Sequence, residues 1–207
     1  MASGSHSNPP TTSSLEPSIP QDLEQLFADL LSLQEESTLS KPPVHLWNPD
    51  KSGDMDMVID REGRWIHEGR EIKRAALVKL FSSILKLEGD NYFLVTPVEK
   101  WQIVVDVAPF FVTAARREIR DSQQAIVLAC STGETLVVSE ENPLQVDTDI
   151  TGHPVPLVNV RDNLTGLLSR PVFYQLVDWA QRAPQDDGCI LFVESMGQRF
   201  SLGSVEG

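Results

Sequence analysis

Residues 73–87 read KRAALVKLFSSILKL, and residues 92–106 read YFLVTPVEKWQIVVD. In the first stretch, apolar side chains recur at the three- and four-residue spacing of one helix face: Ala76, Leu77, Leu80, Phe81, Ile84 and Leu85. The second stretch contains two runs of β-branched and aromatic residues, at 92–96 and 101–106, a composition typical of strands. The sequence therefore predicts a helix over 73–87 followed by two strands.

Further elements are expected on both sides of this stretch. The apolar patterns and the turn residues between them predict strands at 55–60, 64–68, 109–114, 125–130, 135–139, 155–160, 189–194 and 199–202, and a helix at 171–181. At residues 55–60, apolar Met55, Met57 and Ile59 alternate with Asp54 and Asp56, as in a half-buried strand.

An internal duplication would explain the order of these elements. Adding 96 to the residue numbers places helix 73–87 over helix 171–181, and it pairs Arg74 with Arg170 and Val104 with Phe200. We therefore predict an α+β fold made of two similar modules, residues 42–114 and 115–207. Chance similarity between two strand-rich α+β units is the alternative explanation.

The N-terminal region differs in composition from the rest of the chain. Residues 1–17 are rich in Ser, Thr, Pro and Gly and are expected to form a disordered tail. Residues 18–41 are expected to form an N-terminal helix and linker, since apolar residues recur at helical spacing: Leu23, Leu26, Phe27, Leu30 and Leu31. This helix would pack on the main body or dock a protein partner.

Composition restricts the classes of partner. The 207 residues include 30 acidic and 17 basic side chains, for a net charge of −13, which argues against DNA or RNA binding. No run of about 18 apolar residues is present, so no membrane insertion is expected. The first residues have no secretory pattern, and Cys130 and Cys189 are not in metal or redox spacing. These features predict a cytoplasmic protein.

The common catalytic signatures are absent from the sequence. It contains no phosphate-binding G-x-x-x-x-G-K-[ST], no G-x-G-x-x-G, no G-x-S-x-G and no H-E-x-x-H. Cys130 lies in an apolar strand pattern, where cysteine is typically a small buried hydrophobe. No nucleophile, base and orienting group can be named together, and the sequence names no cofactor.

Two carboxylates on the predicted strand 55–60 have a suggestive spacing. Asp54 and Asp56 would lie about 6 to 7 Å apart on the face opposite the methionines. Such a pair can share a divalent cation or receive basic groups of a ligand. The alternative is a solvated strand face or ion pairs to Arg64 and Lys73.

An extended segment, Pro42–Pro49, gathers a titratable ring, a large aromatic face and an amide. His45, Trp47 and Asn48 lie within four residues, a combination that suits a planar heterocycle such as a nucleobase. The alternative role of Trp47 is to anchor the segment to the core. The basic side chains expected to meet anionic groups of a ligand, unless they form ion pairs, are Arg74, Lys79, Lys100 and Arg161.

Several long strings resemble one bacterial family. They are PPVHLWNP at 42–49, GDMDM at 53–57, RAALVKLFSSIL at 74–85, YFLVTPVEKW at 92–101 and SMGQRFSLG at 195–203. The chain resembles, over roughly 42–203, the family catalogued as domain of unknown function 1285. The resemblance implies an α+β protein with two similar modules, the second pleckstrin-homology-like. It also implies a nucleotide-like ligand in a cleft between the modules and a role in signal transduction.

Three functional hypotheses follow, in decreasing order of support. The first is a cytoplasmic, non-enzymatic protein that senses a small anionic, nucleotide-like ligand between its modules. The second is a protein-interaction adaptor that acts through its N-terminal helix, and the third is an enzyme of unknown reaction. The residues predicted to bind the ligand are His45, Trp47, Asn48, Asp54, Asp56, Arg74, Lys79, Lys100 and Arg161.

Overall fold

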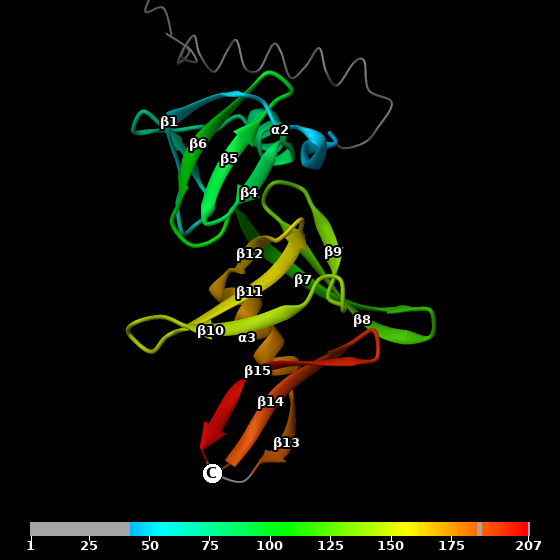
Figure 1. The fold of residues 1–207 in the computed structure, drawn as a ribbon. Coiled ribbons are helices and arrows are strands. Elements are labelled where there is room, and N and C mark those ends of the chain that lie inside the picture. The colour runs from blue at the N-terminus through cyan, green and yellow to red at the C-terminus, as the bar shows by residue number, and fades with distance from the viewer. Residues whose placement is uncertain (1–41, 186–187, 207) are drawn as a thin grey trace, which may run out of the picture. The chain divides into compact units, whose positions relative to one another are not determined.

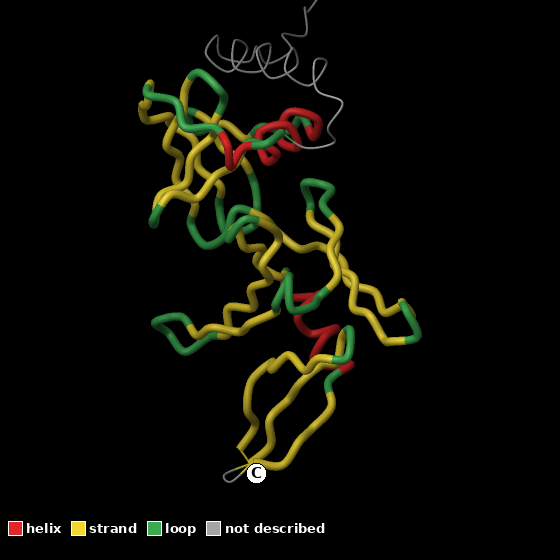
Figure 2. The backbone as a smooth tube through the Cα atoms, turned by 45° about the vertical axis from the view of Figure 1, so that its right-hand side comes forward, coloured by secondary structure: helices red, strands yellow, loops and turns green. Residues whose placement is uncertain are grey.

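The structure, a computed structural model, describes residues 42–185 and 188–206. Of these residues, 56% lie in strands and 14% in helices, so this part of the chain is mostly β (Figure 2). The predicted α+β fold of two similar modules is therefore wrong. The predicted disordered tail and N-terminal helix lie outside the described residues. No described helix is both long and apolar enough to cross a bilayer.

The first half of the described chain, residues 42–108, forms one six-stranded sheet (Figure 1). It contains the short 3-10 helix η1 (Val44–Leu46), the helix α2 (Ala75–Ser83) and the strands β1 (Lys51–Ile59), β2 (Trp65–His67), β3 (Arg70–Glu71), β4 (Leu85–Glu88), β5 (Asn91–Val95) and β6 (Glu99–Val105). The spatial order is β3-β2-β1-β6-β5-β4. Only β1 and β6 pair in parallel, so two antiparallel three-stranded meanders join at the centre of the sheet.

Helix α2 ends four residues earlier than the sequence predicts. The Ser82 hydroxyl donates to the Lys79 carbonyl at 2.8 Å, and the Ser83 hydroxyl donates to the Leu80 carbonyl at 2.6 Å. Such bonds compete with the helix ladder. The following residues, Leu85–Glu88, alternate apolar and charged side chains, and this pattern favours strand β4 over another helical turn.

The core of the first half lies between α2 and one face of the sheet, here called the inner face. Phe81 is fully buried and stacks on Trp65, with ring centroids 6.2 Å apart. Met57 and Ile59 are fully buried on β1, whereas Asp54 and Asp56 are exposed. The predicted alternation along this strand is confirmed.

The second half contains a six-stranded and a three-stranded sheet. The strands of the larger sheet are β7 (Phe110–Arg120), β8 (Gln123–Cys130), β9 (Thr135–Val137), β10 (Leu144–Thr148), β11 (Pro154–Arg161) and β12 (Leu164–Leu168). Their spatial order is β10-β11-β12-β7-β8-β9, and only β12 and β7 pair in parallel. Helix α3 (Arg170–Trp179) leads to the smaller sheet, made of β13 (Gln181–Gln185), β14 (Gly188–Ser195) and β15 (Gln198–Glu206).

The two halves are consequently not copies of one module. The 96-residue shift superposes α2 and β4 on α3 and β13 in sequence. In the first half, however, the three strands that follow the helix (β4, β5 and β6) belong to a six-stranded sheet. In the second half the strands that follow the helix form a sheet of their own (Figure 1). Helix α3 is followed by three further strands, so the second half is a mostly β region with two sheets and not the expected α+β module. The sequence analysis missed five strands: β3, β4, β10, β12 and β13.

Candidate functional site at the junction of the halves

One contact between the halves begins at the turn between β1 and β2. Asp60 organises this turn, because its Oδ1 accepts hydrogen bonds from the backbone N–H groups of Glu62 (3.0 Å) and Arg64 (2.9 Å). The Arg64 Nε donates to Asp60 Oδ2 at 2.7 Å. Burial would raise the Asp60 pKa, but the bonds from Arg64 outweigh it, and the pKa lies below its usual value. The carboxylate therefore stays charged and holds the turn.

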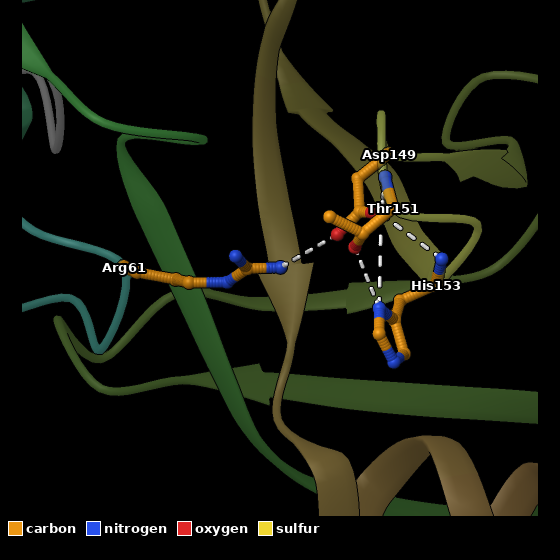
Figure 3. A network of polar contacts seen from close by, with 4 residues as sticks. All are labelled: Arg61, Asp149, Thr151 and His153. Atoms are coloured by element: carbon orange, nitrogen blue, oxygen red, sulfur yellow. Dashed lines mark hydrogen bonds and ion pairs between the residues drawn. The ribbon is translucent and has the colours of Figure 1, made fainter.

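The same turn touches the second half at two residues. Gly63 has φ +73°, and a Cβ added there would lie 2.4 Å from the Cβ of Phe111. Glycine is required at this position by both the backbone conformation and the close approach. On the other side, Arg61 Nη2 lies 4.0 Å from Asp149 Oδ2, across the junction (Figure 3).

Asp149 belongs to a tight loop between β10 and β11. Its Oδ1 accepts from the Thr151 hydroxyl (2.6 Å) and from the backbone N–H groups of Thr151 (2.8 Å) and His153 (2.9 Å). These bonds, with the Thr151 hydroxyl first, lower the Asp149 pKa to about 2. Thr151 Oγ1 also lies 2.7 Å from His153 Nδ1 (Figure 3).

The polarity of this network bears on the enzyme hypothesis. The single Thr151 hydroxyl proton is donated to Asp149, so His153 must donate its Nδ1 proton to the Thr151 oxygen. In this arrangement His153 does not take a proton from Thr151, as a general base would in activating a nucleophile. The network stabilises the conformation of the loop between β10 and β11, whose Asp149 faces Arg61.

A second contact between the halves is made by Arg161 at the end of β11. A register shift between Asn159 and Arg161 marks an irregularity of the type that re-aims a side chain. The Arg161 side chain is only 15% exposed, and its Nη2 donates to the Ser82 carbonyl at 2.5 Å. The guanidinium lies 5.5 Å from the centre of the Phe110 ring. Arg161 thus satisfies a carbonyl at the C-terminal end of α2, where positive charge is favoured.

Glu134, in the turn between β8 and β9, approaches the same serine. Its carboxylate accepts from the Thr132 hydroxyl, and its Oε1 lies 3.3 Å from the Ser82 hydroxyl oxygen. That hydroxyl has one proton, which makes its shorter bond to the Lys79 carbonyl at 2.8 Å. Glu134 Oε1 consequently keeps capacity to accept another hydrogen bond.

Cys130 lies at the start of the Glu134 turn but is not a reactive thiol. Burial, followed by the nearby negative charge of Glu134, raises its pKa to about 12. The thiol is therefore protonated near neutral pH and is a poor nucleophile. This agrees with the interpretation of Cys130 as a small buried hydrophobe.

The predicted ligand-binding residues lie on several different elements of the fold. Lys79 is exposed on α2, and its backbone carbonyl accepts from the Ser82 hydroxyl, whereas the Ser82 carbonyl accepts from Arg161. On the first sheet, Lys86 donates to the backbone carbonyl of Trp47 and pairs with Glu88, which also pairs with Lys100. The remaining predicted residues are exposed: His45, Asn48, Asp54, Asp56 and Arg74.

The two aspartates of β1 do not form a metal centre with their neighbours. The pairing of β1 with β6 shifts register between Asp54 and Val58, which interrupts the regular strand between the two carboxylates. Within residues 42–185 and 188–206, no group of three or more His, Cys, Asp or Glu side chains is arranged to hold a metal ion. Arg64, the alternative ion-pair partner of these aspartates, pairs with Asp60 and Glu62.

Sequence reasoning missed most of the groups at the junction. Ser82 was assigned to the interior of a longer helix, and Glu134 to an ordinary hairpin turn. Arg61 and Asp149 carried no signal beyond their charge. The one usable clue was the Asp-x-Thr-x-His spacing at 149–153, since Asp and Thr side chains commonly bond to backbone groups two residues onward.

Comparison with known proteins agrees with this organisation. Residues 42–108 match a family domain described as "Domain of unknown function (DUF1285), N-terminal domain", and residues 109–202 match "Protein of unknown function (DUF1285), C-terminal domain". The chain belongs to the DUF1285 family. The N-terminal and C-terminal domains of this DUF1285 protein correspond to the two halves described above.

Two solved structures of DUF1285 family proteins are similar to this chain. The protein from Silicibacter pomeroyi is 40% identical, with a TM-score of 0.73 over 85% of this chain and 95% of that one. The protein from Shewanella baltica is 25% identical, with a TM-score of 0.48 over 60% of this chain and 91% of that one. A comparison with curated proteins gives no match.

Proposed function

We propose that this DUF1285 protein binds a small anionic, nucleotide-like ligand at the junction of its two domains, beside Ser82. In this proposal the protein catalyses no reaction and acts as a ligand sensor in the bacterial cytoplasm. The ligand changes how firmly the two domains hold each other, and that change is the signal.

The observation that carries the proposal is the convergence of Arg161 and Glu134 on Ser82. A largely buried guanidinium and a carboxylate reach the end of α2 from two separate elements of the C-terminal domain. Sites for nucleotides need this combination, because phosphates require cations whereas ribose and base require hydrogen-bond acceptors.

Each group has a distinct part in the proposed complex. Arg161 uses Nη2 for Ser82 and approaches Asp162 with Nη1 at 3.5 Å, so its Nε remains to donate to an anionic oxygen. The exposed ammonium of Lys79 supplies a second positive charge on α2. Glu134 Oε1 accepts from a sugar hydroxyl or a base amino group.

The test compares variants that retain the fold. We would titrate the full chain with the diphosphates of the common nucleosides by isothermal calorimetry. Lys79→Ala removes an exposed charge and is expected to weaken binding at low salt without changing the denaturation midpoint. Glu134→Ala removes the acceptor and is expected to weaken binding at both low and high salt. Arg182→Ala, an exposed arginine on β13, is the matched control for loss of one positive charge.

The proposal is contradicted by either of two results. One is that none of these nucleotides binds with a saturable isotherm. The other is that Lys79→Ala and Glu134→Ala bind as tightly as the unmodified chain, which would move the ligand away from Ser82.

A further inference from the structure

A second cluster of charges lies on the outer face of the first sheet, the face opposite α2. The register places Lys86 beside Phe93, Glu88 beside Asn91, and Lys100 beside Val95. Directly paired residues of antiparallel strands point to the same side of a sheet. All of these side chains therefore lie on the outer face, away from the buried contact between α2 and the inner face.

Glu88 joins two lysines in this cluster. Its Oε1 lies 3.0 Å from Lys86 Nζ, and its Oε2 lies 2.5 Å from Lys100 Nζ. The bond from Lys100, and then the bond and charge of Lys86, lower the Glu88 pKa. The exposed fractions are 22% for Lys86, 27% for Glu88 and 18% for Lys100, so all three side chains are partly buried.

Both ammonium groups are held in place from other directions. Lys86 Nζ donates to the Trp47 carbonyl at 2.8 Å, and Lys100 Nζ lies 4.9 Å from the centre of the Phe93 ring. These contacts fix the two cations before any ligand arrives, which reduces the entropy lost on binding.

The donors and charges of the cluster are not balanced. An ammonium group has three N–H donors, of which Lys86 uses two on Trp47 and Glu88, and Lys100 uses one on Glu88. Two positive charges therefore share one carboxylate, although the whole chain carries a net charge of −13. Asp54, the next acid on this face, lies opposite Gln102, and no ion pair joins it to either lysine.

We propose that Lys86 and Lys100 form an anion site for a small carboxylate, separate from the nucleotide site at the domain junction. Glu88 shows that the two ammonium groups are spaced to be spanned by the two oxygens of one carboxylate. A second carboxylate takes the unused N–H donors and neutralises the remaining charge. Glu88 acts as a built-in competitor, because it holds one side of the same cation pair.

This arrangement makes opposite predictions for two variants. Lys100→Gln removes one of the two cations and is expected to weaken binding of benzoate, the probe, by about tenfold. Glu88→Gln removes the competing negative charge and is expected to strengthen benzoate binding by about tenfold. Affinities would be read from saturable shifts of the backbone amides of β4, β5 and β6 in NMR titrations.

Two controls separate this site from other effects. Lys51→Gln breaks the ion pair of Lys51 with Glu99 elsewhere on the same sheet and should leave benzoate affinity unchanged. Lys79→Ala, the variant of the nucleotide site, should also leave it unchanged, so failure of one proposal does not imply failure of the other. Circular dichroism of each variant verifies that it folds, and Lys86→Gln replaces Lys100→Gln if the latter does not.

The anion site is overturned if benzoate shifts do not saturate in the unmodified chain. It is also overturned if Glu88→Gln weakens binding or leaves it unchanged. That result would mean that the cluster only fastens the segment around Trp47 to β4.

Discussion

Arg161 and Arg61 both reach from one domain of the DUF1285 protein to the other, but they do so in different physical settings. Arg161 is 15% exposed, donates to a backbone carbonyl and lies over an aromatic ring. Arg61 is 54% exposed and stands 4.0 Å from a carboxylate that already accepts three hydrogen bonds. One contact is directional and shielded, whereas the other is a solvent-exposed ion pair.

The difference shows that opposite charge alone is a poor guide to what joins the domains. An exposed ion pair is screened by water and salt and contributes little. A guanidinium that satisfies a buried carbonyl prevents the larger penalty of leaving that carbonyl without a donor. We therefore expect the Ser82 side of the junction to carry most of the interdomain stability.

The largest effect is expected for Arg161→Ala. The variant leaves the Ser82 carbonyl without its donor and removes packing on Phe110, so it should lower the free energy of unfolding by about 2 to 3 kcal/mol. Chemical denaturation measures this change. A loss below about 0.5 kcal/mol would mean that the carbonyl finds water instead and that the two arginines are equivalent.

A smaller loss is expected for Gly63→Ala, in the turn that carries Arg61. The left-handed backbone strains any other residue by about 1 kcal/mol or more, and the new Cβ would clash with Phe111. Gly69→Ala is the matched control, because Gly69 has φ +72° with no atom within 4 Å of its added Cβ. A greater loss at Gly63 than at Gly69 would demonstrate the contact between the domains, and equal losses would refute it.

Ser82→Ala should cost about 1 kcal/mol, the usual contribution of one hydroxyl hydrogen bond. Because the hydroxyl proton is directed to the Lys79 carbonyl, the loss should be nearly the same in a Glu134→Gln background. A double-mutant cycle measures this independence. Strong coupling between the two substitutions would assign the proton to Glu134 and would remove the spare acceptor on which the proposed nucleotide site depends.

Arg61→Ala is expected to leave the denaturation midpoint almost unchanged. Asp149 has a lowered pKa of about 2, so it stays ionised in the folded chain as the pH falls from about 8 to about 4. Any contribution of ionised Asp149 to the free energy of unfolding is therefore fully present above the pKa of this residue in the unfolded chain, and it is lost only as the pH approaches 2. The small effect of Arg61→Ala should accordingly not vary over that pH range, and added salt should abolish it. A large loss that resists salt would reverse the ranking of the two arginines.

Sequence patterns located many of the elements but not their assembly. The alternation at Met57 and Ile59 identified β1, and the helical spacing at Leu77, Leu80 and Phe81 identified α2. The same reasoning extended α2 to residue 87, because Ile84 and Leu85 also fit the helical stripe. Ser82 and Ser83 decided the end of the helix through bonds to carbonyls three residues earlier.

The candidate sites were only partly predictable, because the contacts that form them join residues far apart in the sequence. The chemistry of Lys79, Arg161, Trp47 and Lys100 led to their prediction as ligand-binding residues, and in the structure Arg161 contacts Ser82 while Lys100 contacts Glu88. Whether they bind a ligand remains a prediction. Their connecting groups, Ser82 and Glu88, gave no local signal, because their importance depends on residues 79 and 12 positions away along the chain.

What the amino-acid sequence determined is which side chains alternate, which turns need glycine, and the family to which the chain belongs, because these properties depend on neighbours along the chain. Which strands share a sheet was decided only by the tertiary structure. The tertiary structure also decided that Arg161, and not Arg61, makes the buried contact between the domains. The energies of a buried guanidinium and an exposed one differ through the solvent around them, and that solvent is excluded only when distant segments pack together.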